Sequence, residues 1–259
     1  MKKVLFCGCS YVAGSGFSLE KEEPTLWVNL LHQQGKFSGC ELINASVPGR
    51  SNAGIFQDAV YNLTSANYDY AVICWTSVPR FEFELGVELY ATRVSFIPNC
   101  SVQGVGLNQV IYTEDYLNNI RDRFLTLISD HYEIEQLVYY VNSLVNLAKL
   151  TNTKIFFVNS IGPWDQNYFT KLDNILPSEY TAYTRSLLSV DNRDDEQILN
   201  LYNEIHNDYN KAGGIQKNYW LNLYTSLRSL RIDTNDDGVH PGVKSNQIYF
   251  ELLNHLLEL

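Results

Sequence analysis

The sequence predicts an α/β fold in which helices cover both faces of a parallel sheet. Compact apolar runs alternate along the chain with stretches of helical periodicity. Apolar runs of about four to eight residues are typical of strands buried on both faces. Strands that alternate with helices form parallel sheets, because each crossover returns the chain to the same end of the sheet. One domain, 1–259, is expected, since 45% hydrophobic residues in 259 can fill a single core.

Each predicted element is assigned from its own local pattern. The strands are expected at Val4–Cys7, Leu42–Ala45, Ala71–Trp75, Ile155–Val158 and, as a weak fifth candidate, Leu230–Ile232. The helices are expected at Trp27–His32, Ala53–Leu63, Ile134–Leu150, Glu196–Tyr209 and Val243–Leu259. The pattern of the third helix is the clearest, because its apolar residues recur at i, i+3 and i+4 spacing along one face.

Two long stretches interrupt the alternation of strands and helices. Residues 78–132 follow the third predicted strand and residues 162–194 follow the fourth, and both are rich in aromatic side chains. Loops of this length in a compact domain are usually lids, binding walls or small subdomains. We expect both insertions to act as a lid or as binding walls within the single domain.

Composition excludes several classes of partner and cofactor. A net charge of −10 argues against nucleic acid or an anionic membrane, since both are bound through clustered Lys and Arg. Cys7-Gly8-Cys9 lacks the spacing of a zinc site, and no second Cys or His pair follows it. No metal or organic cofactor is therefore expected.

Cysteine usage and the N-terminal segment bear on the compartment. Five cysteines are an odd number, and Cys7, Cys9 and Cys74 lie in or beside apolar runs, which favours buried free thiols in a reducing compartment. The apolar run after Met1-Lys2-Lys3 is too short for a signal peptide, and no run approaches the roughly 18 residues of a membrane span. These features predict a cytoplasmic protein without a membrane partner.

Polar residues that can carry chemistry follow the predicted strands. Ser10 follows the first strand, Gly49 and Asn52 follow the second, Thr76, Ser77 and Arg80 follow the third, and Asp237 and His240 precede the last helix. Ligands of open parallel sheets bind outside the carboxyl ends of the strands. The loops that hold these residues are therefore expected to meet at one edge of the sheet.

Three of these residues are the parts of a hydrolytic triad. A serine hydroxyl is a weak nucleophile near neutral pH unless a base takes its proton, and His240 is the natural base for Ser10. Asp237, three residues earlier, can receive the Nδ1–H of His240 and fix its tautomer. Asp236 is the rival carboxylate and takes second place.

Several segments resemble the conserved blocks of the SGNH/GDSL hydrolase superfamily, including divergent members of the bacteriophage type. Gly8-Cys9-Ser10 resembles the first block, which is usually Gly-Asp-Ser, with Cys9 in place of the Asp. Asn44-Ala45-Ser46-Val47-Pro48-Gly49-Arg50-Ser51 looks like the second block, whose glycine donates a backbone N–H to the oxyanion. Asp237-Gly238-Val239-His240 is similar to the final Asp-x-x-His block.

The resemblance implies a fold and a chemistry. The implied fold is a flavodoxin-like three-layer α/β/α sandwich with a five-stranded parallel sheet, and the implied reaction is ester hydrolysis or acyl transfer. The amides of Ser10 and Gly49 would hold the oxyanion. The third block normally supplies an Asn side chain as a further donor, but Thr76-Ser77-Val78-Pro79-Arg80 contains none. The candidates to replace this Asn are Thr76, Ser77, Arg80 and Asn52; the alternative is that the two amides act alone.

We therefore expect a serine esterase that acts on a small acyl ester, with an O-acetyl group on a carbohydrate as the favoured substrate. The carbohydrate follows from what the family often does and from aromatic insertions suited to stacking on sugars. One alternative is an acyltransferase that uses the same triad. Another is a catalytically weak or inactive binding or assembly protein, which the missing third-block Asn would explain.

Two motifs have competing interpretations. Asp233-Thr234-Asn235-Asp236-Asp237-Gly238 matches the start of a calcium-binding loop, but the twelfth position, where a bidentate Glu is needed, is Lys244. Calcium is therefore disfavoured. Arg80 is a candidate clamp for a substrate anion, and it is equally a candidate ion-pair partner for Glu82 or Glu84.

Overall fold

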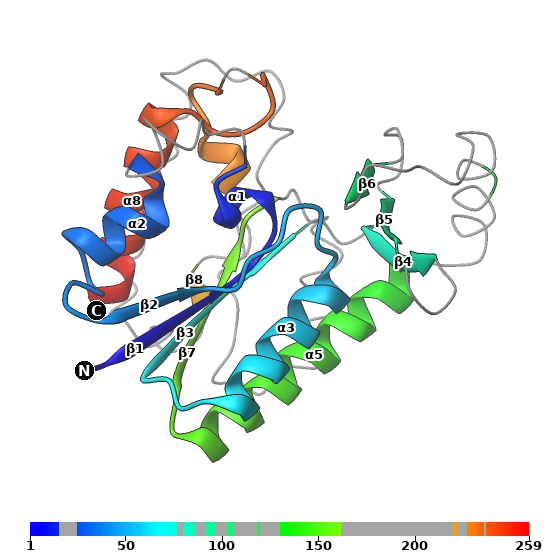
Figure 1. Ribbon diagram of the computed structural model, residues 1–259, viewed down its shortest axis with the longest axis horizontal. Coiled ribbons are helices and arrows are strands. Elements are labelled where there is room, and N and C mark those ends of the chain that lie inside the picture. Colours follow the sequence, from blue (N-terminus) through cyan, green and yellow to red (C-terminus); the bar gives the residue numbers. More distant parts are fainter. Residues whose placement is uncertain are drawn as a thin grey trace.

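The computed structural model describes residues 1–15, 25–76, 80–85, 92–96, 103–105, 119, 130–161, 220–221, 227–235 and 237–258. In these residues, a parallel sheet lies between two layers of helices (Figure 1). The α/β prediction is confirmed.

The sheet is built on strands that the sequence predicted. They are β1 (Lys3–Cys7), β2 (Glu41–Asn44), β3 (Tyr70–Trp75) and β7 (Lys154–Asn159), in the spatial order β2-β1-β3-β7. All of these pairs are parallel, with Phe6 beside Asn44 on one side and Cys7 beside Ile73 on the other. Strand β1 therefore occupies the interior of the sheet, and the loop that follows it is flanked by the loops that follow β2 and β3.

The fifth predicted strand, Leu230–Ile232, is wrong. Residues Leu227–Leu230 form a 3-10 helix, η4, and both of its leucines are buried. The backbone N–H of Ile232 donates to the Ser245 hydroxyl at 3.0 Å instead of joining a strand ladder. Apolar residues at i and i+3 fit a tight helical turn, not the period of two of a strand. The edge beside β7 is instead occupied by a two-residue strand, β8 (Trp220–Leu221).

The helices divide between the two faces of the sheet. One face carries α1 (Ser10–Ala13), α2 (Trp27–Gln33) and α8 (Val243–Glu258), and the other carries α3 (Asn52–Ser65) and α5 (Asp130–Thr151) (Figure 1). Four helix predictions are confirmed, with α5 starting four residues before the expected Ile134. The predicted helix Glu196–Tyr209 lies outside the described residues.

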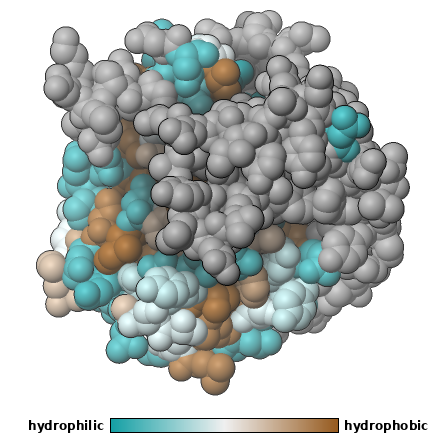
Figure 2. Space-filling view, turned by 45° about the vertical axis from the view of Figure 1, so that its right-hand side comes forward, coloured by the Kyte–Doolittle hydropathy of each residue, from teal (hydrophilic) through white to brown (hydrophobic). Residues whose placement is uncertain are grey.

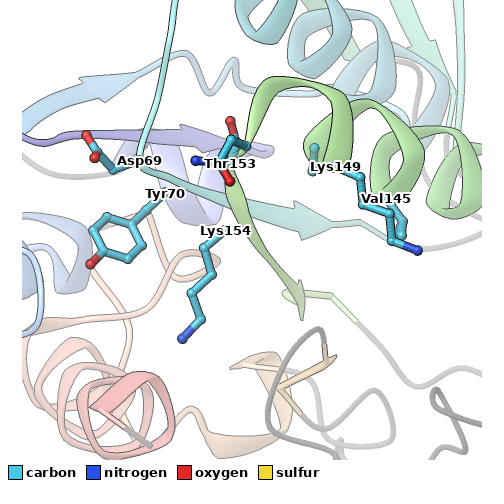
Figure 3. A pocket seen from close by; sticks show the side chains of 8 residues that line it. Asp69, Tyr70, Val145, Lys149, Thr153 and Lys154 are labelled. Carbon is cyan, nitrogen blue, oxygen red and sulfur yellow. The ribbon is translucent and has the colours of Figure 1, made fainter.

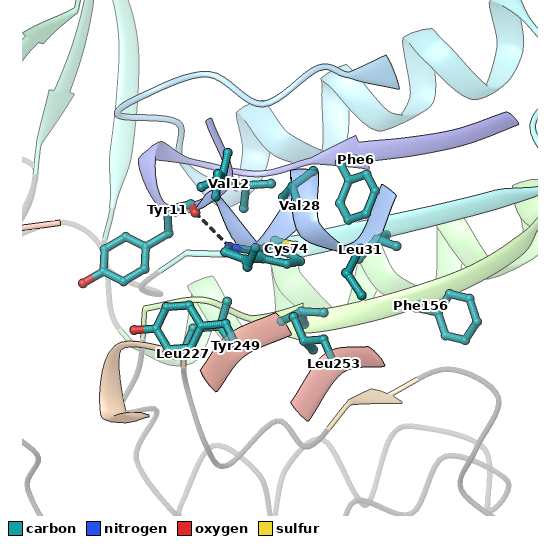
Figure 4. Close-up of a cluster of buried hydrophobic side chains, with 14 of the residues drawn as sticks. Phe6, Tyr11, Val12, Val28, Leu31, Cys74, Phe156, Leu227, Tyr249 and Leu253 are labelled. Carbon is teal, nitrogen blue, oxygen red and sulfur yellow. Dashed lines mark hydrogen bonds between the residues drawn. The ribbon is translucent and has the colours of Figure 1, made fainter. Parts of the chain in front are cut away.

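Alternate side chains of the strands fill two separate cores. Phe6 and Val72 pack with Trp27 and Tyr249 on the α2–α8 face, where Tyr11 and Tyr249 project to the same side (Figure 4). Leu5, Ile73 and Phe157 point to the opposite face and pack against α3 and α5. This alternation is that of a sheet buried on both sides, which explains the continuous apolar runs in the sequence.

Part of the first insertion forms a small sheet of its own. Strands β4 (Phe81–Leu85), β5 (Thr92–Phe96) and β6 (Gln103–Val105) pair antiparallel in that order. The second insertion, 162–194, lies outside the described residues. The role of both as a lid or as binding walls stays a prediction.

The described cysteines agree with the prediction of buried free thiols. Cys7, Cys9 and Cys74, together with Cys40, are buried free thiols, and burial raises the pKa of Cys74 well above its ordinary value. Within the described parts of the chain, no helix has the length and apolarity needed to cross a bilayer. On the face drawn in Figure 2, apolar side chains lie in small groups among hydrophilic ones.

Candidate active site

Ser10 occupies the first position of α1, directly after β1. The turn into this helix is tight: a Cβ on Gly8 would lie 2.5 Å from Cγ2 of Val12 and 3.0 Å from Cβ of Cys74. The one-turn helix ends at Gly14, which has a φ of 79° and donates its N–H to the Ser10 carbonyl. The close packing fixes Ser10 at the carboxyl edge of the sheet, where its residue is 9% exposed.

Asp237 and His240 form a hydrogen-bonded pair in the loop before α8. The Oδ2 atom of Asp237 lies 2.5 Å from Nδ1 of His240, and Oδ1 accepts the backbone N–H groups of Val239 and His240, each at 2.9 Å. Partial burial raises the pKa of Asp237, but the hydrogen bonds from His240 and Val239 outweigh it and lower the pKa to about 2. The carboxylate is thus ionised at neutral pH and binds the ring nitrogen that a triad base must turn away from its nucleophile.

The imidazole of His240 lies beside the residue that follows Ser10. The ring centroids of Tyr11 and His240 are 5.9 Å apart. An Arg231 guanidinium N–H donates to the carbonyl of Val239, immediately before His240. The two ends of the chain therefore meet at one place, as the triad prediction requires.

A chain of buried hydrogen bonds connects the His240 loop with the Ser10 helix. The amide of Asn246, in the first turn of α8, donates to the carbonyls of Pro241 (3.1 Å) and Gly242 (2.9 Å). The same amide accepts the backbone N–H of Trp27 at 3.1 Å. The indole N–H of Trp27 then donates to the carbonyl of Tyr11 at 3.1 Å, the dashed line in Figure 4. Neither Trp27 nor Asn246 was predicted as part of the site.

Asp233 holds the start of α8. Its carboxylate accepts the backbone N–H of Lys244 at 2.9 Å and of Ser245 at 2.7 Å, and a Cβ on Gly242 would come within 2.6 Å of it. The carboxylates of the calcium-like motif thus bind other groups in this fold. That of Asp233 accepts N–H groups at the start of α8, and that of Asp237 binds His240. Asp236 lies outside the described residues.

The loop after β2 follows the end of β1 closely. Ala45 donates its N–H to Phe6 (2.8 Å) and Val47 donates to Gly8 (3.1 Å), so the parallel ladder continues past both strands. The Arg50 N–H then donates to the Val47 carbonyl at 3.3 Å across a Pro48-Gly49 turn. Gly49 has a φ of 78°, the value that the third residue of a type II turn requires.

Asn52 and Arg80 tie the loops after β2 and β3 together. The Asn52 amide accepts the Thr76 N–H at 2.9 Å and donates to the Thr76 carbonyl at 3.3 Å. From the other loop, Arg80 donates to the carbonyl of Arg50 at 3.4 Å. The structure therefore brings Gly49, Asn52, Thr76 and Arg80 together, as expected. Ser77 lies outside the described residues.

A buried ion pair supports the same loop. Both Nε and Nη2 of Arg50 donate to the carboxylate of Asp58, in the second turn of α3, at 2.7 and 2.5 Å. The side chain of Arg50 is 7% exposed and that of Asp58 is 21% exposed. No local pattern in the sequence indicated this pair, because the loop conformation decides which way Arg50 turns.

One described pocket lies at the opposite edge of the sheet. It has a volume of about 510 Å³, and Tyr70 and Lys154, the first residues of β3 and β7, help to line it (Figure 3). None of the predicted site residues lines it. Ligands of open parallel sheets bind at the carboxyl edge, so this pocket is separate from the candidate active site.

Comparisons with known proteins give distant likenesses to solved structures. These include members of the lipolytic protein G-D-S-L family and acetylxylan esterases. No family model matches the sequence, and no curated relative does.

Three solved structures illustrate the likeness. TesA is 14% identical, with a TM-score of 0.47 over 99% of this chain and 98% of its own. A catalytic mutant of Axe2, an acetylxylan esterase from Geobacillus stearothermophilus, is 12% identical, with a TM-score of 0.47 over 99% and 94%. A member of the lipolytic protein G-D-S-L family from Veillonella parvula is 11% identical, with a TM-score of 0.45 over 100% and 99%. The likeness is a distant one.

The Arg50–Asp58 pair gives a test of what holds the β2 loop. We expect Asp58→Asn to lower the free energy of unfolding by about 3 kcal/mol, because it removes the carboxylate charge that binds two N–H groups of a buried guanidinium. Glu41→Gln is the matched control: it breaks the exposed Lys3–Glu41 pair, 3.0 Å apart, and should cost less than about 1 kcal/mol. Urea unfolding of both variants measures the difference. Equal losses would contradict a supporting role for the buried pair.

The low pKa of Asp237 predicts a defined pH dependence of stability. A carboxyl group with a folded-state pKa of about 2, below its ordinary 3.8, stabilises the fold fully above pH 4. That contribution is lost as the pH falls through the folded-state pKa. The stability difference between wild type and Asp237→Asn should therefore shrink between about pH 4 and pH 2. Urea unfolding at stepped pH measures it, and a difference constant down to pH 2 would refute the prediction.

Proposed function

We propose that this protein is a serine esterase with Ser10 as nucleophile, His240 as base and Asp237 as the orienting carboxylate. The observation that carries the proposal is the Asp237–His240 pair, 2.5 Å between Oδ2 and Nδ1, placed beside Tyr11, the neighbour of Ser10. Because Nδ1 is held by the carboxylate, Nε2 is the nitrogen left for a serine proton. In such a triad the carboxylate binds the imidazole, and the imidazole binds the serine hydroxyl.

The reaction would proceed through an acyl-enzyme. Ser10 Oγ attacks the ester carbonyl while His240 takes its proton, and His240 then returns that proton to the departing alcohol. Water attacks the acyl-enzyme by the same route in reverse.

The backbone N–H of Ser10 is at the first position of α1, where a helix offers no acceptor. The N–H groups of Val12 and Ala13, later in the same turn, donate to the Cys9 carbonyl, each at 3.0 Å. With the Gly49 amide on the neighbouring turn, the Ser10 N–H would hold the oxyanion.

We further propose a small acyl group, with an O-acetylated carbohydrate as the substrate. The low exposure of Ser10, 9%, favours a short acyl chain. Phe56 lies one turn after Asn52 in α3 and stacks on Tyr140 of α5, with their ring centroids 4.6 Å apart. Tyr139 beside them is 60% exposed. An aromatic surface of this kind suits the apolar face of a sugar.

The first test compares wild type with Ser10→Ala and His240→Ala on p-nitrophenyl acetate. Each substitution should lower kcat at least about a thousandfold, since the members of a triad act as a unit. Both variants should unfold in urea as wild type does. An O-acetylated oligosaccharide tests the substrate, and products formed with an added alcohol acceptor separate esterase from acyltransferase.

Equal rates in the three proteins would contradict the triad. So would a wild type that forms no covalent Ser10 adduct with a fluorophosphonate probe, which would instead favour a binding protein that keeps the fold.

The buried Asn246 gives a second test, directed at the position of His240. Asn246→Ala removes the groups that bind Trp27, Pro241 and Gly242, so kcat on p-nitrophenyl acetate should fall at least about tenfold. Asn254→Ala is the matched control on the same helix, since Asn254 accepts the Lys36 N–H at 2.6 Å, away from the site. It should lower the unfolding free energy but leave kcat unchanged. If both variants lost kcat in proportion to stability, Asn246 would have no specific positioning role.

A further inference from the structure

Arg80 is a buried cation, and the described residues accept hydrogen bonds from only some of its N–H groups. It is 8% exposed, its Nη1 atom donates to the carbonyl of Arg50 at 3.4 Å, and its Nε atom is buried without a hydrogen-bond partner. A guanidinium has five N–H groups in a rigid fork. The group therefore keeps donor capacity after its contact with Arg50.

The charge of Arg80 is not balanced by the described acidic residues. The carboxylate of Asp58 already binds Arg50 through two hydrogen bonds. The ion pairs among the described residues include none with Arg80. A buried charge without a counter-ion is costly, and buried donors without acceptors are rare. The two expected ion-pair partners, Glu82 and Glu84, lie on β4, and a pairing of Arg80 with either stays a prediction.

The guanidinium of Arg80 binds the same loop that holds Gly49, one of the two proposed oxyanion donors. Its contact is the carbonyl of Arg50, the residue that follows Gly49. Of the other candidates for a third donor, Ser77 lies outside the described residues, and Thr76 and Asn52 are less suited to the role. The Thr76 side chain is fully buried, and the Asn52 amide is held by the Thr76 backbone through both its oxygen and its nitrogen.

We propose that the Arg80 guanidinium stabilises the oxyanion that forms when Ser10 attacks the substrate carbonyl. The inference rests on the esterase function proposed above. As the bond from Ser10 Oγ to the carbonyl carbon forms, the π pair moves onto the carbonyl oxygen and the serine proton goes to His240. Arg80 keeps its own proton and donates an N–H to the new anion. The pair returns when the alcohol leaves with the proton from His240.

The test uses Arg80→Gln and Arg80→Lys in the full chain with p-nitrophenyl acetate, a neutral ester. We expect Arg80→Gln to lower kcat about a hundredfold while KM changes less than about twofold, because the anion exists only in the transition state. Arg80→Lys keeps the positive charge but loses the planar guanidinium, so its kcat should lie between those of wild type and Arg80→Gln. Lys154→Gln, which removes one positive charge at the opposite edge of the sheet, is the control and should match wild type.

A second readout separates this role from packing. An alkyl boronic acid becomes a tetrahedral anion on Ser10, so its inhibition constant should rise in Arg80→Gln by about the same factor as kcat falls. If kcat fell only in step with thermal stability and boronate affinity stayed at the wild-type value, Arg80 would be a packing residue and the inference would be wrong. Should Arg80→Gln fail to fold, the same comparison is made with Arg80→Lys.

Other results would also overturn the inference. Wild-type kcat on p-nitrophenyl acetate in Arg80→Gln, with a loss confined to p-nitrophenyl hemisuccinate, would assign Arg80 to a substrate carboxylate. Failure of this inference is distinguishable from failure of the esterase proposal. In the first case wild type hydrolyses the ester, Ser10→Ala does not, and Arg80→Gln equals wild type. In the second case wild type itself is inactive.

Discussion

The site depends on the parallel ladder between β1 and β2, which continues beyond the ends of both strands. The bonds from Ala45 to Phe6 and from Val47 to Gly8 hold the second loop against the first. Since β1 is an interior strand, the loop after β3 reaches the same place from the other side. The neighbourhood of Ser10 is therefore set by backbone pairing, and the side chains at this edge only refine it.

The second requirement is that residues near the C-terminus reach Ser10, and helix α8 meets it. Its first turn is fixed by Asp233, and its buried Asn246 binds both the loop that holds His240 and the start of α2. Trp27 of α2 in turn donates its indole N–H to the carbonyl of Tyr11, next to Ser10. His240 and Ser10 are thus placed relative to each other through buried polar contacts, which tolerate little displacement.

Local pattern was sufficient to predict the long strands and to select Ser10, Asp237 and His240 as a candidate triad, which stays a prediction. It was insufficient where tertiary contacts decide the structure. Phe81-Glu82-Phe83-Glu84-Leu85 alternates with the period of a strand, so β4 could have been found, but its partners follow from long-range pairing. Leu227 and Leu230 have the spacing of a helical turn. The short apolar run Leu230–Ile232, taken without Leu227, suggested a strand instead. The Arg50–Asp58 and Asn52–Thr76 contacts join segments whose relative placement no local pattern contains.

The proposed use of Arg80, in place of the Asn that the resemblance leads one to expect, changes the electrostatics at this edge of the sheet. A neutral amide costs little to bury when it is hydrogen-bonded, whereas a guanidinium must be supported by acceptors. Arg80 is supported by the carbonyl of Arg50, and Arg50 keeps its own position by binding Asp58. Hydrogen bonds to an ionised donor are roughly twice as strong as neutral ones, so an anion formed beside Arg80 gains more than it would from an amide. Under the proposed mechanism, the cost of burying the cation falls on the resting protein and the gain on the transition state, where binding energy raises kcat.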